Sequence, residues 1–388
     1  FREDSNLAFS PEGRYIGFKS YSSNLVDGDT NIQPDIFLYD RQTCQTSRMS
    51  VSSSGVQANN LSFVFGRYIS SDANYVAFTS FATTLVANDT NNRADIFLHN
   101  RQTGETTRVI SDVVPIRGPS ITPDGNKLVF SSDVTSLVLN DTNNKSDVFL
   151  YDQINTEFTR ISLYPGINQL NQNSNGYGIP SDDGRYVAFE SGGLRMPYLR
   201  DLQTGETASM NGNSQGGNPV VSANGQYMVF WSAATNLVSG DTNSAYDIFV
   251  YAVQNAQIRR VSIASDGTQA NGASFWPDIS ADGRYISFDS VASNLVPNDM
   301  NNKSDVFLHD RLTGKTSLVS LAVDGTQGDN DSKMTAISSD GQWVAFSSDA
   351  SNLVPGDTNN FCETNFDGSI TDNCWDVFVR QLALDALT

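Results

Sequence analysis

The chain has 388 residues, of which 38% are hydrophobic, and its 43 acidic and 24 basic residues give a net charge of −19. A surface this acidic repels the phosphates of nucleic acids and of anionic membranes, so we expect neither as a partner. No run of 18 or more apolar residues occurs, so the sequence predicts no insertion into a membrane.

A short block with a tight turn recurs seven times along the chain. Each copy begins with Ser or Thr, continues through a turn pair that is usually Asp-Gly, and closes on Phe. Asp-Gly between two β-rich runs is typical of a β-hairpin, because both turn positions need a positive φ. The predicted hairpins begin near Ser10, Ser70, Thr122, Ser181, Ser222, Ser280 and Ser338.

A second block follows the first in every unit and predicts another hairpin. It opens with DIFLYD or a variant of it, and most copies continue through a turn into a run such as Thr-Arg-Val. Apolar and polar residues alternate here, as in half-buried strands. Two hairpins give four strands per unit, and radial repetition of such units protects their edges. We therefore expect an all-β fold, a seven-bladed β-propeller of four-stranded antiparallel blades, with residues 1–388 as a single domain.

The pattern Ser-x-Asp-Gly-Arg-Tyr-Val-Ala-Phe-x-Ser resembles the WD40-like propeller repeat of TolB-type proteins. Its seven copies cover nearly the whole chain. The resemblance implies a β-propeller and no particular activity, because such folds host many functions. The units exceed the usual length of about 40–45 residues, and the excess lies mostly in the connection after the first hairpin.

That longer connection carries an acidic loop in six of the seven units. Its first Asp stands eleven residues after the closing Phe, and in five units Asn and Asp follow at the third and seventh positions. Such oxygen ligands on a tight turn suit Ca²⁺, which prefers six to eight of them. The expected ligands are Asp29, Asn31, Asp35, Asp89, Asn91, Asp95, Asp141, Asn143, Asp147, Asp241, Asn243, Asp247, Asp299, Asn301, Asp305, Asp357, Asn359 and Asp376. The alternative is a set of hydrogen-bonded turns without metal, because Asp and Asn favour turns for backbone reasons alone.

Units four and seven depart from this pattern. In unit four, Phe189 runs directly into the second hairpin, and the acidic loop is missing. In unit seven the loop is expanded, and Cys362 and Cys374 flank an eleven-residue insertion. We expect these two cysteines to form a disulfide, which is typical of an extracellular, cell-surface or periplasmic protein; two reduced thiols are the alternative. The chain opens directly in a repeat and shows no signal peptide, so we expect a mature or trimmed product.

The search for catalytic residues yields no predicted catalytic group. His99 and His309 occupy a strand position that three other units fill with Tyr, which indicates a packing role. Outside the repeat pattern, Arg195 and Tyr198 are the candidates for the neutralising Arg and the base of a polysaccharide lyase.

The sequence favours a secreted or cell-surface, calcium-stabilised binding or scaffold module for carbohydrate or protein. Trp231, Phe275 and Trp276 lie off the repeat pattern and suit ligand contacts, because aromatic residues are frequent anchors at interfaces; core packing is their alternative role. Two other functions stay open. One is an extracellular lyase or hydrolase that acts on polysaccharide at the central channel, and the other is a structural matrix or adhesin unit.

Overall fold

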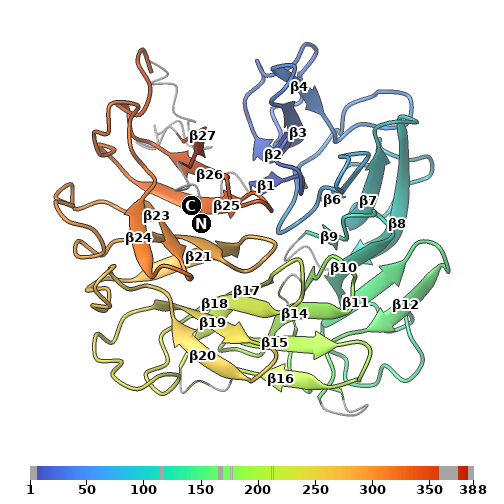
Figure 1. Ribbon diagram of the computed structural model, residues 1–388. Helices are drawn as coiled ribbons and strands as arrows, with labels where there is room; N and C mark the ends of the chain where they lie inside the picture. The colour runs from blue at the N-terminus through green and yellow to red at the C-terminus, as the bar shows by residue number, and fades with distance from the viewer. Residues whose placement is uncertain are drawn as a thin grey trace.

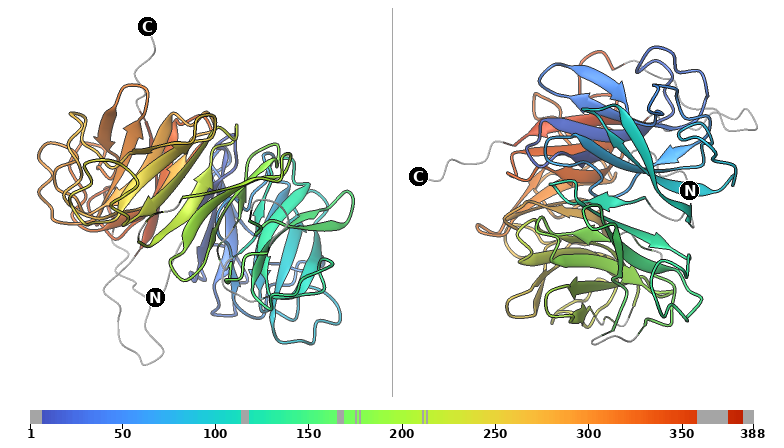
Figure 2. Two further views of the ribbon diagram at one scale, coloured as in Figure 1. Left: turned by 90° about the horizontal axis from the view of Figure 1, so that it is seen from below. Right: turned by 90° about the vertical axis from the view of Figure 1, so that its right-hand side faces the viewer.

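The computed structural model describes residues 7–113, 118–164, 169–174, 176, 178–210, 212, 214–357 and 375–382. These residues form 27 strands in seven antiparallel sheets, which stand around a common axis as a seven-bladed β-propeller (Figure 1). The predicted fold class is therefore confirmed. The side views in Figure 2 show the twisted sheets of the ring from two further directions.

The first three blades follow one another along the chain, each numbered from the axis outward. Blade 1 contains β1 (Ala8–Phe9), β2 (Tyr15–Ser20), β3 (Asp35–Asp40) and β4 (Gln45–Arg48). Blade 2 contains β5 (Ser62–Phe63), β6 (Tyr75–Ser80), β7 (Ala94–Asn100) and β8 (Glu105–Val113). Blade 3 contains β9 (Ser120–Ile121), β10 (Lys127–Ser132), β11 (Asp147–Asp152) and β12 (Glu157–Arg160).

The remaining blades complete the ring in the same order. Blade 4 contains β13 (Ile179–Pro180), β14 (Tyr186–Ser191), β15 (Met196–Asp201) and β16 (Thr207–Ser209). Blade 5 contains β17 (Gly216–Val221), β18 (Tyr227–Ser232), β19 (Asp247–Ala252) and β20 (Gln257–Arg260). Blade 6 contains β21 (Ser274–Ile279), β22 (Tyr285–Ser290), β23 (Asp305–Asp310) and β24 (Lys315–Leu318). Blade 7 contains β25 (Ser332–Ile337), β26 (Trp343–Ser348) and β27 (Asp376–Gln381), the strands that its described residues form.

The predicted Asp-Gly hairpins join the first and second strand of the blades. In blade 6 the hydroxyl of Ser280 accepts the backbone N–H of Tyr285 at 3.0 Å and donates to Asp282 at 2.6 Å. Gly283 takes a φ of 76°, which glycine adopts without steric cost. Side chains of the turn itself therefore help to fix its conformation.

A pair of aromatic rings fills the centre of each blade, one from its second strand and one from its third. Ring centroids lie 5.2–6.2 Å apart in these seven cross-strand pairs. Blade 4 uses Phe189 and Tyr198, and the other blades use two phenylalanines. Most of these rings are fully buried, so the pairs form the core between neighbouring sheets.

At four seams between blades, a tyrosine of one blade packs on the turn glycine of the next, which is Gly125, Gly225, Gly283 or Gly341. A Cβ atom added to Gly283 would lie 2.2 Å from the ring of Tyr227, so only glycine fits beneath that ring. Blades 7 and 1 meet in the same manner, with Trp343 beside Gly13. Arg41 stacks on Trp343 at 3.5 Å from the ring centroid. The ring is therefore closed by an aromatic ring beside a turn glycine, the kind of contact found at those four seams.

Some sequence predictions lie outside the described residues. Asn359, Cys362 and Cys374 belong to this group, so the predicted disulfide and part of the seventh loop stay predictions. Cys44 is described, and it is a free, exposed thiol. Within the described part of the chain, no helix is long and apolar enough to cross a membrane.

Candidate functional site

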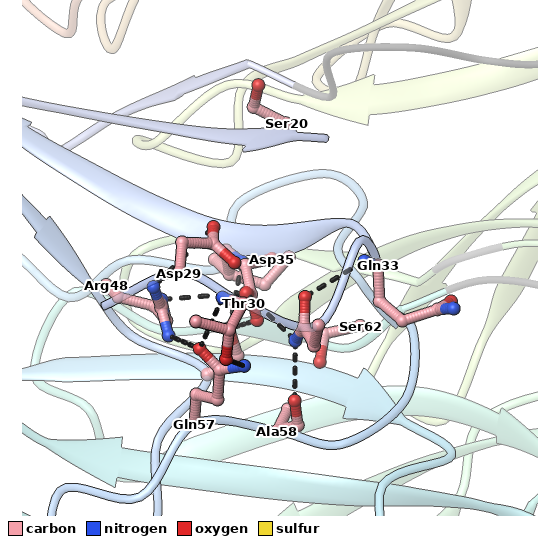
Figure 3. Close-up of polar contacts among 12 residues, drawn as sticks. Ser20, Asp29, Thr30, Gln33, Asp35, Arg48, Gln57, Ala58 and Ser62 are labelled. Atoms are coloured by element: carbon pink, nitrogen blue, oxygen red, sulfur yellow. Dashed lines mark hydrogen bonds and ion pairs between the residues drawn. The ribbon is translucent and has the colours of Figure 1, made fainter. Parts of the chain in front are cut away.

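The acidic loops lie on the face of the ring opposite the Asp-Gly turns, because each joins the end of a second strand to the start of a third. In blade 1 the structure brings the predicted residues Asp29 and Asp35 together (Figure 3). The predicted Asn31 contacts Asp35. Asp35 is fully buried and accepts the hydroxyl of Ser50 at 2.5 Å. The amide of Asn31 donates to Asp35 at 3.3 Å, and its oxygen accepts the backbone N–H of Gln33 at 2.9 Å. The Asn oxygen is thus engaged in the turn.

An arginine from the fourth strand lies between the two carboxylates of the loop. Arg48 approaches both Asp29 and Asp35, at 3.5 Å in each case. Three other blades repeat this arrangement, and the nitrogen–oxygen distances in the four sites span 3.0–3.8 Å. The equivalent arginines are Arg108, Arg160 and Arg260. Most of these distances exceed a good N–H···O bond, so the contact is mainly ionic.

The sequence contained a signal for these arginines that the interpretation of the acidic loop missed. Each stands thirteen residues after the second Asp of its loop, within the Thr-Arg-Val type of run. A serine fifteen residues after that Asp is a second repeated partner. Ser50, Ser162, Ser262 and Ser320 donate to the buried Asp at 2.5–2.6 Å.

The four arginine-containing loops fit a divalent cation poorly. The guanidinium already places a positive charge between the carboxylates, and a second cation would be repelled by it. Among the described residues, those of blade 6 included, no group of three or more His, Cys, Asp or Glu side chains is placed to hold a metal ion. What the loops hold in these blades is a buried ion pair formed by the chain itself.

Blade 6 differs because Leu318 takes the place of the arginine. Leu318 pairs with Phe307, as Arg48 pairs with Phe37 in blade 1. The amide of Gln327 donates to Asp299 at 2.8 Å and to Asp305 at 2.9 Å, so a neutral group bridges the carboxylates. Burial raises the pKa of Asp305 to about 6. This loop therefore carries two carboxylates without an internal cation.

The two histidines are packing residues, as the sequence predicts. In His99 and His309, Nδ1 lies 2.9 Å from the hydroxyl of Thr106 and Thr316, respectively. Each threonine hydroxyl donates in turn to a backbone carbonyl, of Val51 and of Ile263, in the connection that follows the preceding blade. Burial lowers the pKa of both imidazoles, to about 4 for His309. Both are therefore neutral hydrogen-bonded links between blades at pH 7.

Arg195 and Tyr198 are not brought together at a common open space. Arg195 donates to Glu190 at 3.0 Å and to Asn218 at 3.2 Å. Tyr198 is buried and stacks on Phe189 in the centre of blade 4. Their contacts indicate structural roles. Of the off-pattern aromatics, Trp231 and Phe275 pack edge to face at 5.7 Å, and Trp276 lines the central channel.

A buried carboxylate that the sequence did not single out lies between blades 6 and 7. Asp289 is 3% exposed and accepts the backbone N–H of Met334 at 3.3 Å. Burial raises its pKa to about 7, so the folded state holds a proton that the unfolded chain releases near pH 4.

The stability of the protein should consequently fall as pH rises from 4 to 7, by about 1.4 kcal/mol per pH unit for this group. Asp289→Asn keeps an oxygen for Met334 and removes the titration, so its stability profile should be flatter. Urea unfolding at pH 5 and pH 8 measures both profiles, with the exposed Asp27→Asn as the control. Parallel profiles for the wild type and Asp289→Asn would contradict the assignment.

The central channel contains a cavity of about 120 Å³ to which all seven blades contribute. The residues that follow the first Ser or Thr of each hairpin form a ring: Pro11, Ser71, Pro123, Asp182, Ala223, Ala281 and Ser339. Of these, Pro11, Pro123, Asp182 and Ser339 line the cavity at its mouth. Backbone hydrogen bonds of 2.8–3.0 Å link members of this ring between blades, as from Ser71 to Pro123 and from Ala281 to Ser339. Asp182 is the charged member of the ring.

Blade 2 sends a segment of its first strand into the channel. Ser62 and Ser70 are eight positions apart, whereas the equivalent Ser274 and Ser280 in blade 6 are six apart. The two additional residues interrupt the strand after Phe63. The chain from Phe65 to Arg67, called the channel segment here, then lines the cavity.

The channel segment contacts blades across the ring. Phe65 packs against the hydrophobic core of blades 4 to 6. The carbonyl of Arg67 accepts the backbone N–H of Ile121 in blade 3 at 2.6 Å, and its guanidinium reaches the carbonyl of Ile279 in blade 6 at 3.5 Å. The next residue, Tyr68, turns outward and is fully buried against blade 1. There Gly17 replaces the larger residue of the other blades, since a Cβ would lie 2.7 Å from Tyr68.

No protein-family model matches this chain, and no curated protein is significantly similar to it in sequence. Solved structures do resemble it. The propeller domain of the Trilobed protease from Pyrococcus furiosus, described as having an open velcro topology, is 11% identical over 90% of both chains, with a TM-score of 0.54. An oligogalacturonate lyase in complex with manganese is 14% identical over 88% of this chain and 84% of its own, with a TM-score of 0.53. TolB from Acinetobacter baumannii is 17% identical over 88% of this chain and 78% of its own, with a TM-score of 0.43. At these identities the similarity concerns the fold alone.

Proposed function

We propose that this propeller is a binding module whose ligand, a protein or a carbohydrate, docks at the mouth of the central channel. The observation that carries the proposal is the cavity of about 120 Å³, lined from every blade by mostly apolar residues with a few charged groups. Concave, largely apolar sites with a few polar groups are where proteins bind ligands. The proposal includes a location outside the cytoplasm, for which the spacing of Cys362 and Cys374 is the support.

Binding of labelled protein to a glycan array and a peptide array tests this function. We expect binding on one of the two arrays, and its loss in Ser339→Trp, which fills the channel mouth. Glu157→Trp, on an exposed outer strand, is the control and should bind normally. No binding on either array, or unchanged binding by Ser339→Trp, would argue against a ligand site in the channel.

The second part of the proposal is that calcium stabilises the ring through the loop of blade 6 and, in unit seven, through Asp357, Asn359 and Asp376. Blade 6 supports it because Asp299 and Asp305 lack the arginine found in four other blades. Asn301 and Gln327 supply further oxygen atoms once their side chains turn. In blades 1, 2, 3 and 5 the guanidinium takes the place of the metal.

Calcium should raise the melting temperature, and a chelator should reverse the shift, because a ligand specific to the folded state stabilises it by about 2.7 kcal/mol at a hundred times its Kd. Asp299→Asn should lower the stoichiometry of bound calcium by one ion. Asp241→Asn, the same change beside Arg260, is the matched control and should leave it unchanged. Loss of an ion in the control, or none in Asp299→Asn, would contradict the assignment of the site.

A further inference from the structure

The lining of the channel cavity contains one positively charged side chain and two negatively charged ones. Arg67 is the basic residue that lines the cavity, and Asp182 and Asp278 are the acidic ones. The carboxylate of Asp278 already accepts two hydrogen bonds within the protein, from the backbone N–H groups of Ile279 and Ile337, each at 2.9 Å. Asp182 is exposed at the mouth, where the guanidinium of Arg67 attracts its carboxylate, and no described residue donates a hydrogen bond to that carboxylate.

The guanidinium of Arg67 has more N–H donors than its hydrogen bonds in the channel use. A guanidinium carries five N–H groups, and the contact of Nη2 with the carbonyl of Ile279 is a long one, at 3.5 Å. Within the described residues its remaining N–H groups form no hydrogen bond, although the guanidinium attracts the carboxylates of Asp182 and Asp278. An incoming group with a carbonyl oxygen would satisfy them, because Arg presents its donors in a fixed planar fork.

We infer that the occupant of the channel is a basic peptide segment, with a Lys or Arg side chain on Asp182 and a backbone carbonyl on Arg67. This inference rests on the proposed function and narrows its ligand to one class. Charge complementarity supports it twice, in the net negative lining of the cavity and in the −19 charge of the whole chain. A negative surface steers basic partners toward it at low ionic strength.

The size and the lining of the cavity favour a peptide side chain over a sugar chain. Sites that enclose whole drug-sized molecules measure about 300–1,000 Å³, and this cavity measures about 120 Å³. Ile121, Ile179, Val220 and Ile337 supply apolar walls, against which the methylene stem of Lys or Arg packs while its charged end stays hydrated.

Three peptides of equal length test the inference by ligand-observed NMR: acetyl-Ala-Lys-Ala-amide, the same peptide acetylated on its lysine, and acetyl-Ala-Glu-Ala-amide. Maltotriose is the carbohydrate probe. The lysine peptide should bind most tightly, and Asp182→Asn should weaken it about fivefold, as expected for a partly exposed ion pair. Asp182→Glu, which keeps the charge, should retain most of the affinity. Glu157→Gln, an exposed acid on an outer strand, should bind like the wild type.

The outcomes separate this inference from the proposed function. Equal or tighter binding of the acetylated peptide, the Glu peptide or maltotriose, with binding still blocked by Ser339→Trp, would overturn the inference and leave the channel site standing. Binding that survives Ser339→Trp would overturn both. Melting temperatures of all variants show whether a loss of binding reflects loss of the fold, and Asp182→Glu separates charge from folding at this position.

Discussion

Replacing Arg160 by leucine should lower the free energy of unfolding by about 3–5 kcal/mol at neutral pH, because it leaves buried carboxylates without their partner. The side chain of Arg160 is 6% exposed, and those of Asp141 and Asp147 are 2% and 0% exposed. Burial already raises the pKa of Asp147 with the arginine in place. Without the arginine, Asp147 should take up a proton more readily, so the loss of stability in the variant should become smaller as pH falls.

Urea unfolding of Arg160→Leu at pH 7.5 and pH 5 measures this deficit. The control is Arg259→Leu, which removes an exposed arginine and should cost less than about 0.5 kcal/mol. The reverse change, Leu318→Arg in blade 6, should restore the ion pair there and abolish calcium binding by that loop. A deficit of less than 1 kcal/mol for Arg160→Leu would show that the loop rearranges to hydrate its carboxylates.

Phe249→Ala should destabilise the ring by about 3–5 kcal/mol, the usual cost of truncating a buried aromatic residue. Phe249 is completely buried and stacks on Phe230 with centroids 5.7 Å apart. It belongs to the hydrophobic core that joins blades 4, 5 and 6, so the cavity left behind would lie where neighbouring sheets meet.

Thermal and urea unfolding give the cost of Phe249→Ala, with Phe249→Leu as the comparison. Leucine keeps much of the volume and apolar surface, so its cost should be clearly smaller. A similar cost for both substitutions would mean that the ring–ring contact with Phe230, and not the filled volume, stabilises the blade.

The fold could be predicted because each blade repeats the same short sequence pattern, which determines its local structure. Turns such as that of Ser280 to Gly283 are fixed by side chains within a few residues of one another, and they recur seven times. Strand order then follows from chain order, since neighbouring strands pair in sequence. The contact that closes the ring between blades 7 and 1 could not be predicted in this way, because Trp343 and Gly13 are far apart in the sequence.

The candidate sites were harder to predict, because their decisive partners are distant in sequence. Asp29 and Asp35 were recognised as a pair, yet Arg48 belongs to a strand that pattern analysis treated as ordinary. The channel posed a different difficulty. The two additional residues in blade 2 resemble ordinary variation in loop length. Arg67 lines the channel because this segment lies near the axis of the ring, which the sequence does not indicate.

The seam between the first and last blades has a mechanical consequence. Within the described residues, blades 1 and 7 share no strand, and Trp343, Gly13 and Arg41 meet there through side-chain packing. Tension applied to the two ends of the chain would therefore part this seam while each sheet kept its strands. The closed ring would open into a curved row of intact blades before any of them unravelled.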